Sequence, residues 1–188
     1  WDRELPSWAF HRTRFRSGPP QLPRLLVASG DRLYLPLGLG KPVSALEAAT
    51  GEVLKTYKQT EDAEEIIETN GTLLVVRGKP VAEQAAKHDR FKKQYTFPNQ
   101  KQIVALDARS GETLWTWSPG EGHYRPETLG SDGERVFCQV GEAVVCLDLT
   151  SGEKLWSHGE LNGSKARRRL TYGQHTLVIS DGVVLCKL

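Results

Sequence analysis

The chain has 188 residues, with 25 Lys and Arg against 23 Asp and Glu, and three cysteines. A net charge of +2 indicates no dedicated polyanion partner such as a nucleic acid. No stretch reaches the roughly 18 apolar residues of a membrane-spanning helix, so we expect no membrane span. The sequence has no methionine and no signal peptide, and we interpret it as an excised or processed segment of a larger protein.

Residues 1–23 are expected to form an N-terminal segment outside the regular repeats. Trp1, Trp8, Phe10 and Phe15 lie there among basic side chains, and a Ser-Gly-Pro-Pro run excludes regular structure. A mixture of aromatic and basic residues is also typical of a nucleic-acid surface. We favour the other interpretation, in which the aromatic rings cover sheet edges and the arginines are solvated.

Residues 24–188 contain short apolar, β-rich runs separated by turn signals such as Asn70-Gly71 and Asp132-Gly133. The runs fall into four units. The expected strands are 24–28, 32–37, 42–46 and 52–57 in the first unit, 64–69, 72–77, 102–106 and 113–117 in the second, 127–130, 135–140, 143–147 and 154–157 in the third, and 169–172, 176–180 and 183–186 in the fourth.

The second unit carries an insertion at residues 79–101. It has a helical composition after Pro80 and is expected to project from one face of the protein. One interpretation is a tolerated, solvated excursion of the chain. The other is a binding loop, because long insertions in repeat proteins often serve binding. We prefer the first interpretation, and the best argument for the second is a group of aromatic and basic residues: Phe91, Lys92, Lys93, Tyr95 and Phe97.

An eleven-residue motif recurs three times, at residues 45–55, 105–115 and 146–156. Each copy has a small residue first, an acid third, Ser or Thr sixth, Gly seventh and Glu eighth. The eleventh residue is tryptophan in two copies and Lys55 in the other. Repeats of about 40 residues are typical of propellers with four strands per blade. The predicted fold is therefore all-β, a β-propeller of about four four-stranded antiparallel blades.

The chemistry of the motif indicates a strand, a tight turn and another strand. Its acid can cap backbone amides of the turn, its glycine supplies a positive φ, and its tryptophan is expected to pack over the small residue of a neighbouring unit. These structural docking residues are Ala45, Gly51, Ala105, Asp107, Gly111, Trp115, Cys146, Asp148, Gly152 and Trp156. At Lys55 we expect a looser junction, with the aliphatic stem over the neighbouring unit and the amine in water.

The cysteines are interpreted as small buried residues. Cys146 and Cys186 are 40 residues apart, and both are assigned to the small docking position. An alternative is a bridge between Cys138 and Cys146 across a hairpin at Gly141-Glu142. No Cys-x-x-Cys or His-x-x-His spacing occurs, so no structural zinc site is expected.

The pattern Ala-x-Asp-x-x-Ser/Thr-Gly-x-x-x-Trp resembles the tryptophan-docking motif of PQQ-like repeat β-propellers. That group includes quinoprotein alcohol dehydrogenases and outer-membrane-assembly lipoproteins. The sequences of the repeats resemble most the propeller regions of large multidomain bacterial proteins. The resemblance implies a periplasmic or secreted location, and it implies a fold more strongly than a function, because many such propellers bind no quinone.

Two functions follow from the resemblance as hypotheses. The first is a non-catalytic module that binds a protein or ligand, or that scaffolds other domains of the parent protein, with no cofactor. The alternative is part of a quinone-dependent dehydrogenase. Those enzymes use adjacent bridged cysteines, a calcium site, an Asp base and a stacked Trp, and no Cys-Cys pair or calcium-loop pattern occurs here. No nucleophile elbow or phosphate loop is present either.

Closure of the repeats is the last expectation. Trp1 followed by Asp2-Arg3-Glu4-Leu5 is what an outer strand with a docking tryptophan would look like. We therefore expect residues 1–5 to pair with residues 183–188. Pairing within one chain would close a four-bladed ring, and pairing between two chains would give a homodimer by strand exchange. The third alternative is an open arc inside a longer chain.

Overall fold

The computed structural model describes residues 1–4, 24–38, 40–78, 101–120, 124–125, 127–161 and 177–186. Within these ranges the secondary structure is β-strand, with one short 3-10 helix, η1 (Lys58–Thr60). The strands form three four-stranded antiparallel sheets and one two-stranded sheet. The predicted all-β fold with four-stranded antiparallel blades is confirmed.

The strands of each sheet follow one another in chain order, as in propeller blades. Blade 1 contains β1 (Val27–Ser29), β2 (Arg32–Pro36), β3 (Val43–Glu47) and β4 (Val53–Thr56). Blade 2 contains β5 (Ala63–Thr69), β6 (Thr72–Arg77), β7 (Gln102–Asp107) and β8 (Thr113–Trp117). The predicted strands of these two blades agree with the observed ones to within three residues at each end.

Blade 3 contains β9 (Gly130–Ser131), β10 (Arg135–Val140), β11 (Ala143–Asp148) and β12 (Lys154–His158). Its inner strand is shorter than expected, because Glu127 has a φ of +63° and cannot continue a strand. A two-stranded hairpin follows, β13 (Leu177–Ser180) and β14 (Val183–Cys186). The expected strand at 169–172 lies outside the described residues.

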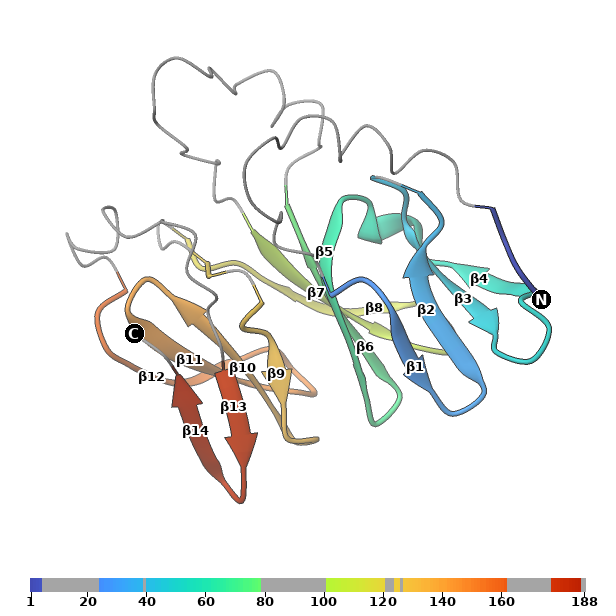
Figure 1. Cartoon of the computed structure of the whole chain (residues 1–188). Coiled ribbons are helices and arrows are strands. Elements are labelled where there is room, and N and C mark those ends of the chain that lie inside the picture. Colours follow the sequence, from blue (N-terminus) through green and yellow to red (C-terminus); the bar gives the residue numbers. More distant parts are fainter. Residues whose placement is uncertain are drawn as a thin grey trace, which may run out of the picture.

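The three blades stand side by side, and their inner strands β1, β5 and β9 are neighbours (Figure 1). Residue 1 lies beside blade 1 at one end of this arrangement, and the β13–β14 hairpin lies at the other end, next to blade 3. The arrangement is an open arc, so the four-bladed ring closed within one chain is not what the structure shows. In the described residues β14 pairs with β13 and with no other strand, and residues 1–4 form no strand.

The core lies between the blades, because successive residues of a strand point to opposite faces of its sheet. In β6, Leu73 and Val75 pack against blade 1, while Leu74 and Val76 pack against blade 3. All four side chains are essentially inaccessible to solvent. Burial of one such aliphatic side chain contributes roughly 1.5–3 kcal/mol, so these contacts between blades stabilise the arc strongly.

The same alternation separates the cysteines. Across β10 and β11, Cys138 lies opposite Val145 and Phe137 lies opposite Cys146, so the two cysteines point to opposite faces of blade 3. Cys138 and Cys146 are not joined by a disulfide. The alternative of a bridge between Cys138 and Cys146 is therefore wrong.

Candidate functional site

The main-chain hydrogen bonds of the repeated turn are the same in its three copies, and the second and third copies add a side-chain cap. Asp107 Oδ1 accepts hydrogen bonds from the backbone N–H groups of Arg109 (3.0 Å) and Ser110 (2.6 Å). Asp148 Oδ1 does the same for Thr150 (2.9 Å) and Ser151 (2.8 Å). The hydrogen bonds from the serine N–H groups are the largest cause that lowers the pKa of each carboxyl below its ordinary value.

The glycine of each turn has a positive φ, between +71° and +74° at Gly51, Gly111 and Gly152. Just before each turn, the pairing of the third and fourth strands shifts by one residue, which marks a β-bulge. The motif therefore builds a rigid corner that presents a bare glycine surface to the neighbouring blade.

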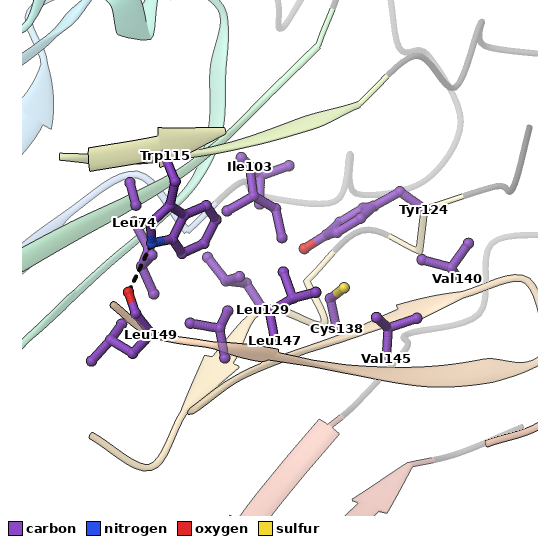
Figure 2. Packing of buried hydrophobic residues seen from close by; sticks show 13 residues of the cluster. Leu74, Ile103, Trp115, Tyr124, Leu129, Cys138, Val140, Val145, Leu147 and Leu149 are labelled. Atoms are coloured by element: carbon purple, nitrogen blue, oxygen red, sulfur yellow. Dashed lines mark hydrogen bonds between the residues drawn. The ribbon is translucent and has the colours of Figure 1, made fainter. Parts of the chain in front are cut away.

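Trp115 of blade 2 covers this surface on blade 3. A Cβ atom on Gly152 would come within 2.5 Å of Trp115 Cδ2, and the indole Nε1 donates a hydrogen bond to the Leu149 carbonyl at 2.8 Å (Figure 2). Only 8% of Trp115 is exposed. The expected contact with the small residue of the neighbouring blade differs: Ala105 lies opposite Trp115 on the adjacent strand of the same blade. Ala105 therefore leaves space for the Trp115 ring within blade 2, and the ring packs against Gly152 of blade 3.

Trp1 makes the same two contacts on blade 1. Its Nε1 donates to the Ala48 carbonyl at 2.9 Å, and its ring covers Gly51, where a Cβ would come within 2.5 Å of Cε3. Ala48 and Leu149 hold the same position of the motif, three residues after its first. Arg3 adds a hydrogen bond to the Gly51 carbonyl at 2.8 Å. Residues 1–4 therefore lie where the outer strand of a preceding blade would place its tryptophan.

At the junction between blades 1 and 2, Lys55 covers the turn glycine and Tyr57 donates the hydrogen bond to the carbonyl. The Lys55 stem covers Gly111, where a Cβ would come within 2.6 Å of Lys55 Cε. The Tyr57 hydroxyl donates to the Ala108 carbonyl at 2.6 Å, at the motif position of Leu149. Tyr57 is almost fully buried, and burial is the main cause that raises the pKa of its hydroxyl to about 12. Gln59 Nε2 also donates to the Gly111 carbonyl at 2.8 Å.

Trp156 departs from the expectation of a buried docking residue. It lies opposite Cys146, as Trp115 lies opposite Ala105, but 40% of it is exposed. Its ring contacts Phe137 of the same blade, with ring centroids 6.1 Å apart. Among the glycines that the structure describes, none has the Trp156 ring as a nearest contact in the way that Gly152 has Trp115.

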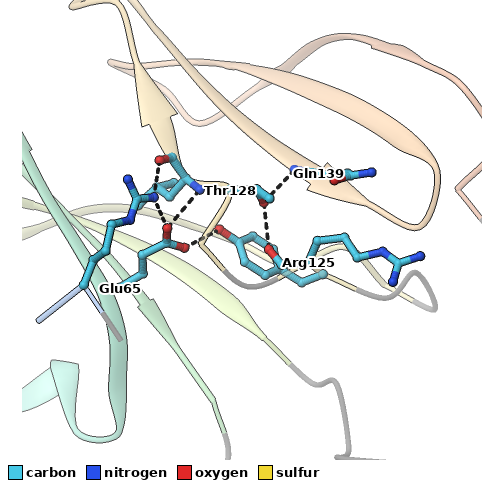
Figure 3. A network of polar contacts seen from close by, with 7 residues as sticks. Glu65, Arg125, Thr128 and Gln139 are labelled. Carbon is cyan, nitrogen blue, oxygen red and sulfur yellow. Dashed lines mark hydrogen bonds and ion pairs between the residues drawn. The ribbon is translucent and has the colours of Figure 1, made fainter. Parts of the chain in front are cut away.

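A buried carboxylate connects the inner strands. Glu65 of β5 pairs with Arg24, which precedes β1, and accepts hydrogen bonds from Leu129 N at 3.2 Å and Tyr124 Oη at 3.1 Å (Figure 3). Arg24 also donates to the Leu129 carbonyl at 2.7 Å. Burial raises the pKa of Glu65 above its ordinary value, although the Arg24 charge and the hydrogen bonds oppose that shift. This cluster joins residues that precede β1 and β9 to the inner strand of blade 2.

A second polar group lies at the β10–β11 hairpin. Arg125 Nε donates to the Gly141 carbonyl at 3.0 Å, and the Arg125 N–H donates to the Gln139 carbonyl at 2.8 Å. Arg125 and Gln139 are both buried. Arg125 Nη1 and Gln139 Oε1 have no hydrogen-bond partner among the described residues. Burial lowers the pKa of Arg125.

The remaining candidate binding residues from the sequence lie mostly outside the described residues. The insertion at 79–101, with Phe91, Lys92, Lys93, Tyr95 and Phe97, lies outside the described residues except for Lys101, which pairs with Glu64. Within the described ranges, no three His, Cys, Asp or Glu side chains are grouped closely enough to hold a metal ion. No helix there is long and apolar enough to cross a bilayer.

The sequence reasoning missed Tyr57 and Glu65. Tyr57 lies two residues after the motif ends, and a search for tryptophan at the eleventh position does not reach it. The available signal was the pair Lys55 and Tyr57, in which an aromatic residue follows the missing tryptophan on the same face of the strand. Glu65 stands in a run of acids, Glu61-Asp62-Ala63-Glu64-Glu65, that gives no sign of which one is buried.

Four-stranded antiparallel blades joined through repeated glycine turns are the architecture of a β-propeller, of which the described residues form an open arc. Residues 99–187 match the family model described as outer membrane protein assembly factor BamB, which covers slightly less than half of the chain. No curated protein matches the sequence.

Solved structures share this fold at low sequence identity. The computationally designed protein Ika8 has a TM-score of 0.56 and 14% identity, and the similarity covers 87% of this chain and 42% of that one. Quinohemoprotein alcohol dehydrogenase ADHIIG from Pseudomonas putida HK5 has a TM-score of 0.51 and 13% identity, over 86% of this chain and 30% of that one. BamB from Moraxella catarrhalis has a TM-score of 0.48 and 16% identity, over 69% and 33%. The chain thus spans less than half the length of each.

Proposed function

We propose that this chain is a non-catalytic PQQ-like propeller module that binds a protein or ligand, or that scaffolds other domains of its parent protein. The observation that carries this proposal is that the acidic side chains of the repeated turns and of the buried cluster already have hydrogen-bond partners within the chain. Asp107 and Asp148 are occupied by backbone N–H groups of their own turns. Glu65 is occupied by Arg24, Tyr124 and Leu129. These acids hold turns and blades in place.

The surface supports a role in contacts with other proteins. Large apolar side chains are exposed along one end of the arc, at Leu155 and Trp156 of β12 and on the β13–β14 hairpin. Exposed apolar groups of this kind are typical of interaction surfaces. The insertion at 79–101, which contains Phe91 and Tyr95, is a further proposed contact region.

A location in the periplasm or outside the cell is part of the proposal. The support for it is the match of residues 99–187 to the family model of an outer membrane protein assembly factor. Fusing the parent gene to a reporter that folds only after export would test it, and reporter activity confined to the cytoplasm would contradict it.

Titration with PQQ in millimolar calcium tests the non-catalytic part of the proposal. We expect equilibrium dialysis and absorbance spectroscopy to show no saturable binding of the quinone. Binding of one quinone per chain that a calcium chelator abolishes would overturn the proposal. It would favour the alternative, in which the chain is part of a quinone-dependent dehydrogenase. Free tryptophan and a mixture of amino acids at matched concentrations would show how much absorbance change arises from nonspecific quinone adducts.

A further inference from the structure

We propose that Asn70 is a site of slow, spontaneous deamidation that Glu68 holds in check, and that this modification loosens the junction between blades 2 and 3. Asn70 and Gly71 form the two-residue turn between β5 and β6, because Thr69 and Thr72 lie opposite each other in the ladder. Both turn residues are exposed. The inference rests on the chemistry of this turn and is independent of the proposed non-catalytic role.

The backbone of the turn requires this pair of residues. Asn70 has a φ of +48° and Gly71 a φ of +78°. A positive φ at both central positions is typical of a type I′ turn, which favours Asn followed by Gly. The same pair is chemically labile, because glycine has no side chain to shield its backbone nitrogen from the preceding carboxamide. The fold thus places a reactive dipeptide at an exposed position.

The reaction needs no reagent other than water. The Gly71 backbone nitrogen loses its proton and attacks Asn70 Cγ, the new C–N bond closes a cyclic imide, and the bond from Cγ to Nδ2 breaks with loss of ammonia. Water then adds to one carbonyl carbon of the imide and opens the ring. The product is an aspartate or an isoaspartate at position 70. One carboxamide and one water become one carboxylate and one ammonium ion, with no oxidation or reduction.

Glu68 restrains the attacking nitrogen. The Gly71 N–H donates a hydrogen bond to Glu68 Oε1 at 2.8 Å. The other carboxylate oxygen accepts a hydrogen bond from the Ser29 hydroxyl of blade 1, which fixes the carboxylate in place. A negative charge beside this N–H disfavours the loss of its proton, and therefore disfavours the attack on Asn70 Cγ.

The Asn70 side chain also joins two blades. Its Nδ2 donates a hydrogen bond at 2.8 Å to the carbonyl of Gly133, which lies in the turn between β9 and β10 of blade 3. A Cβ atom on Gly133 would come within 3.0 Å of this Nδ2, so the two turns lie in close contact. Deamidation replaces the donor with a carboxylate oxygen, which can only accept. The junction then loses this hydrogen bond and gains repulsion between two oxygens.

Peptide mapping by mass spectrometry during incubation at neutral pH tests the first half of the proposal. A second Asn-Gly pair, Asn162-Gly163, is present in the sequence outside the described residues, and its conversion serves as an internal clock. We expect aspartate and isoaspartate to accumulate at position 70 of the folded chain, more slowly than in the same chain unfolded in urea. Glu68→Ala should accelerate this conversion at least about threefold without changing the rate at Asn162.

Glu68→Gln is the matched control, because its amide oxygen can still accept from the Gly71 N–H while the charge is gone. Its rate should lie between those of the unmodified chain and Glu68→Ala. An Asn70 that stays intact in the folded chain until the unfolded chain has converted completely would overturn the proposal. An unchanged rate in Glu68→Ala, or equal acceleration at Asn162, would overturn the local restraint by Glu68.

Urea denaturation of Asn70→Asp tests the second half. We expect its equilibrium constant for unfolding to be roughly three to ten times that of the unmodified chain, because a donor to the Gly133 carbonyl is lost. Asn70→Gly keeps a residue suited to the positive φ and removes the donor without adding a charge, so its loss should be smaller. Equal stability of Asn70→Asp and the unmodified chain would show that deamidation does not loosen this junction.

Discussion

Tyr57 donates its hydroxyl hydrogen to the Ala108 carbonyl at 2.6 Å, across the junction between blades 1 and 2. At the other two described junctions a tryptophan Nε1 donates to the equivalent carbonyl, of Ala48 or Leu149. The Tyr57 hydroxyl and the aliphatic stem of Lys55 thus together take the place of one indole. This relationship leads to the first prediction.

Tyr57→Phe should lower the free energy of unfolding by about 0.5–1.5 kcal/mol, because it removes the shorter of two hydrogen bonds to the Ala108 carbonyl. The carbonyl keeps the hydrogen bond from Arg32 Nη1 at 3.3 Å. Lys55→Met is the matched variant: it keeps the aliphatic cover over Gly111 and removes the amine, so its effect should stay within about 0.5 kcal/mol. Urea denaturation measures both. Equal stability of Tyr57→Phe and the unmodified chain would show that the hydroxyl contributes nothing to this junction.

Trp115→Ala should cost roughly 3–5 kcal/mol, as truncations of buried aromatic residues do. Trp156→Ala should cost less than half as much, because the Trp156 indole is far more exposed and, within the described residues, lies against no glycine turn. The two residues hold the same motif position, so the pair isolates the contact between blades. Chemical denaturation of both variants checks this, and equal losses would contradict it.

Gly152→Ala should destabilise the chain more than Gly182→Ala. Both glycines have a positive φ, +71° and +75°, so an added Cβ strains both backbones by about 1 kcal/mol. At Gly152 the Cβ would also meet the Trp115 ring within 2.5 Å, while at Gly182 no heavy atom of the described residues, apart from its chain neighbours, lies within 4 Å. Thermal unfolding compares them. If Gly182→Ala is as damaging as Gly152→Ala, the ring contact is not what requires glycine.

The buried Glu65 predicts a pH dependence. Burial raises its pKa in the folded chain, so the folded state binds this proton more readily than the unfolded state does. The stability contributed by the protonated form is therefore fully present below the ordinary glutamate pKa, and is lost as pH rises through the higher, folded value.

Comparison of the unmodified chain with Glu65→Gln isolates this effect, because the turn acids Asp107 and Asp148 are common to both. The difference in unfolding free energy between the two proteins should shift against the unmodified chain as pH rises from about 4 toward neutrality. Urea titrations at several pH values measure it. A difference that does not change with pH, or that shifts the other way, would contradict the raised pKa.

Replacement of the insertion should leave folding intact. Arg77 and Gln102, which flank it, lie opposite each other in the ladder of β6 and β7. A short Asn-Gly turn in place of residues 79–100 can therefore close the hairpin, and loop length itself costs little. We expect a melting temperature within a few degrees of the original. Collapse of the fold would show that Phe91, Tyr95 or Phe97 is part of the core and would end the candidacy of this segment as a binding loop.

The strands of blades 1 and 2 were predictable because their alternation and turn residues are local properties of the chain. The turn glycines and the aspartate caps were predictable for the same reason. The partner of Trp115 was not, because the residue across a blade junction depends on how one sheet seats against the next. The buried state of Glu65 was hidden as well, since its partners Arg24 and Leu129 are 41 and 64 residues away.

At each described junction the hydrogen-bond acceptor is a main-chain carbonyl, of Ala48, Ala108 or Leu149. A carbonyl is present whatever side chain the residue carries, so mutation can alter only the donor half of the contact. At the junction between blades 1 and 2 the donor is the Tyr57 hydroxyl and not an indole N–H, and the hydrogen bond to the carbonyl is kept. Blades of this kind can therefore diverge in sequence while their mutual orientation is inherited, and a count of tryptophans underestimates the number of intact junctions.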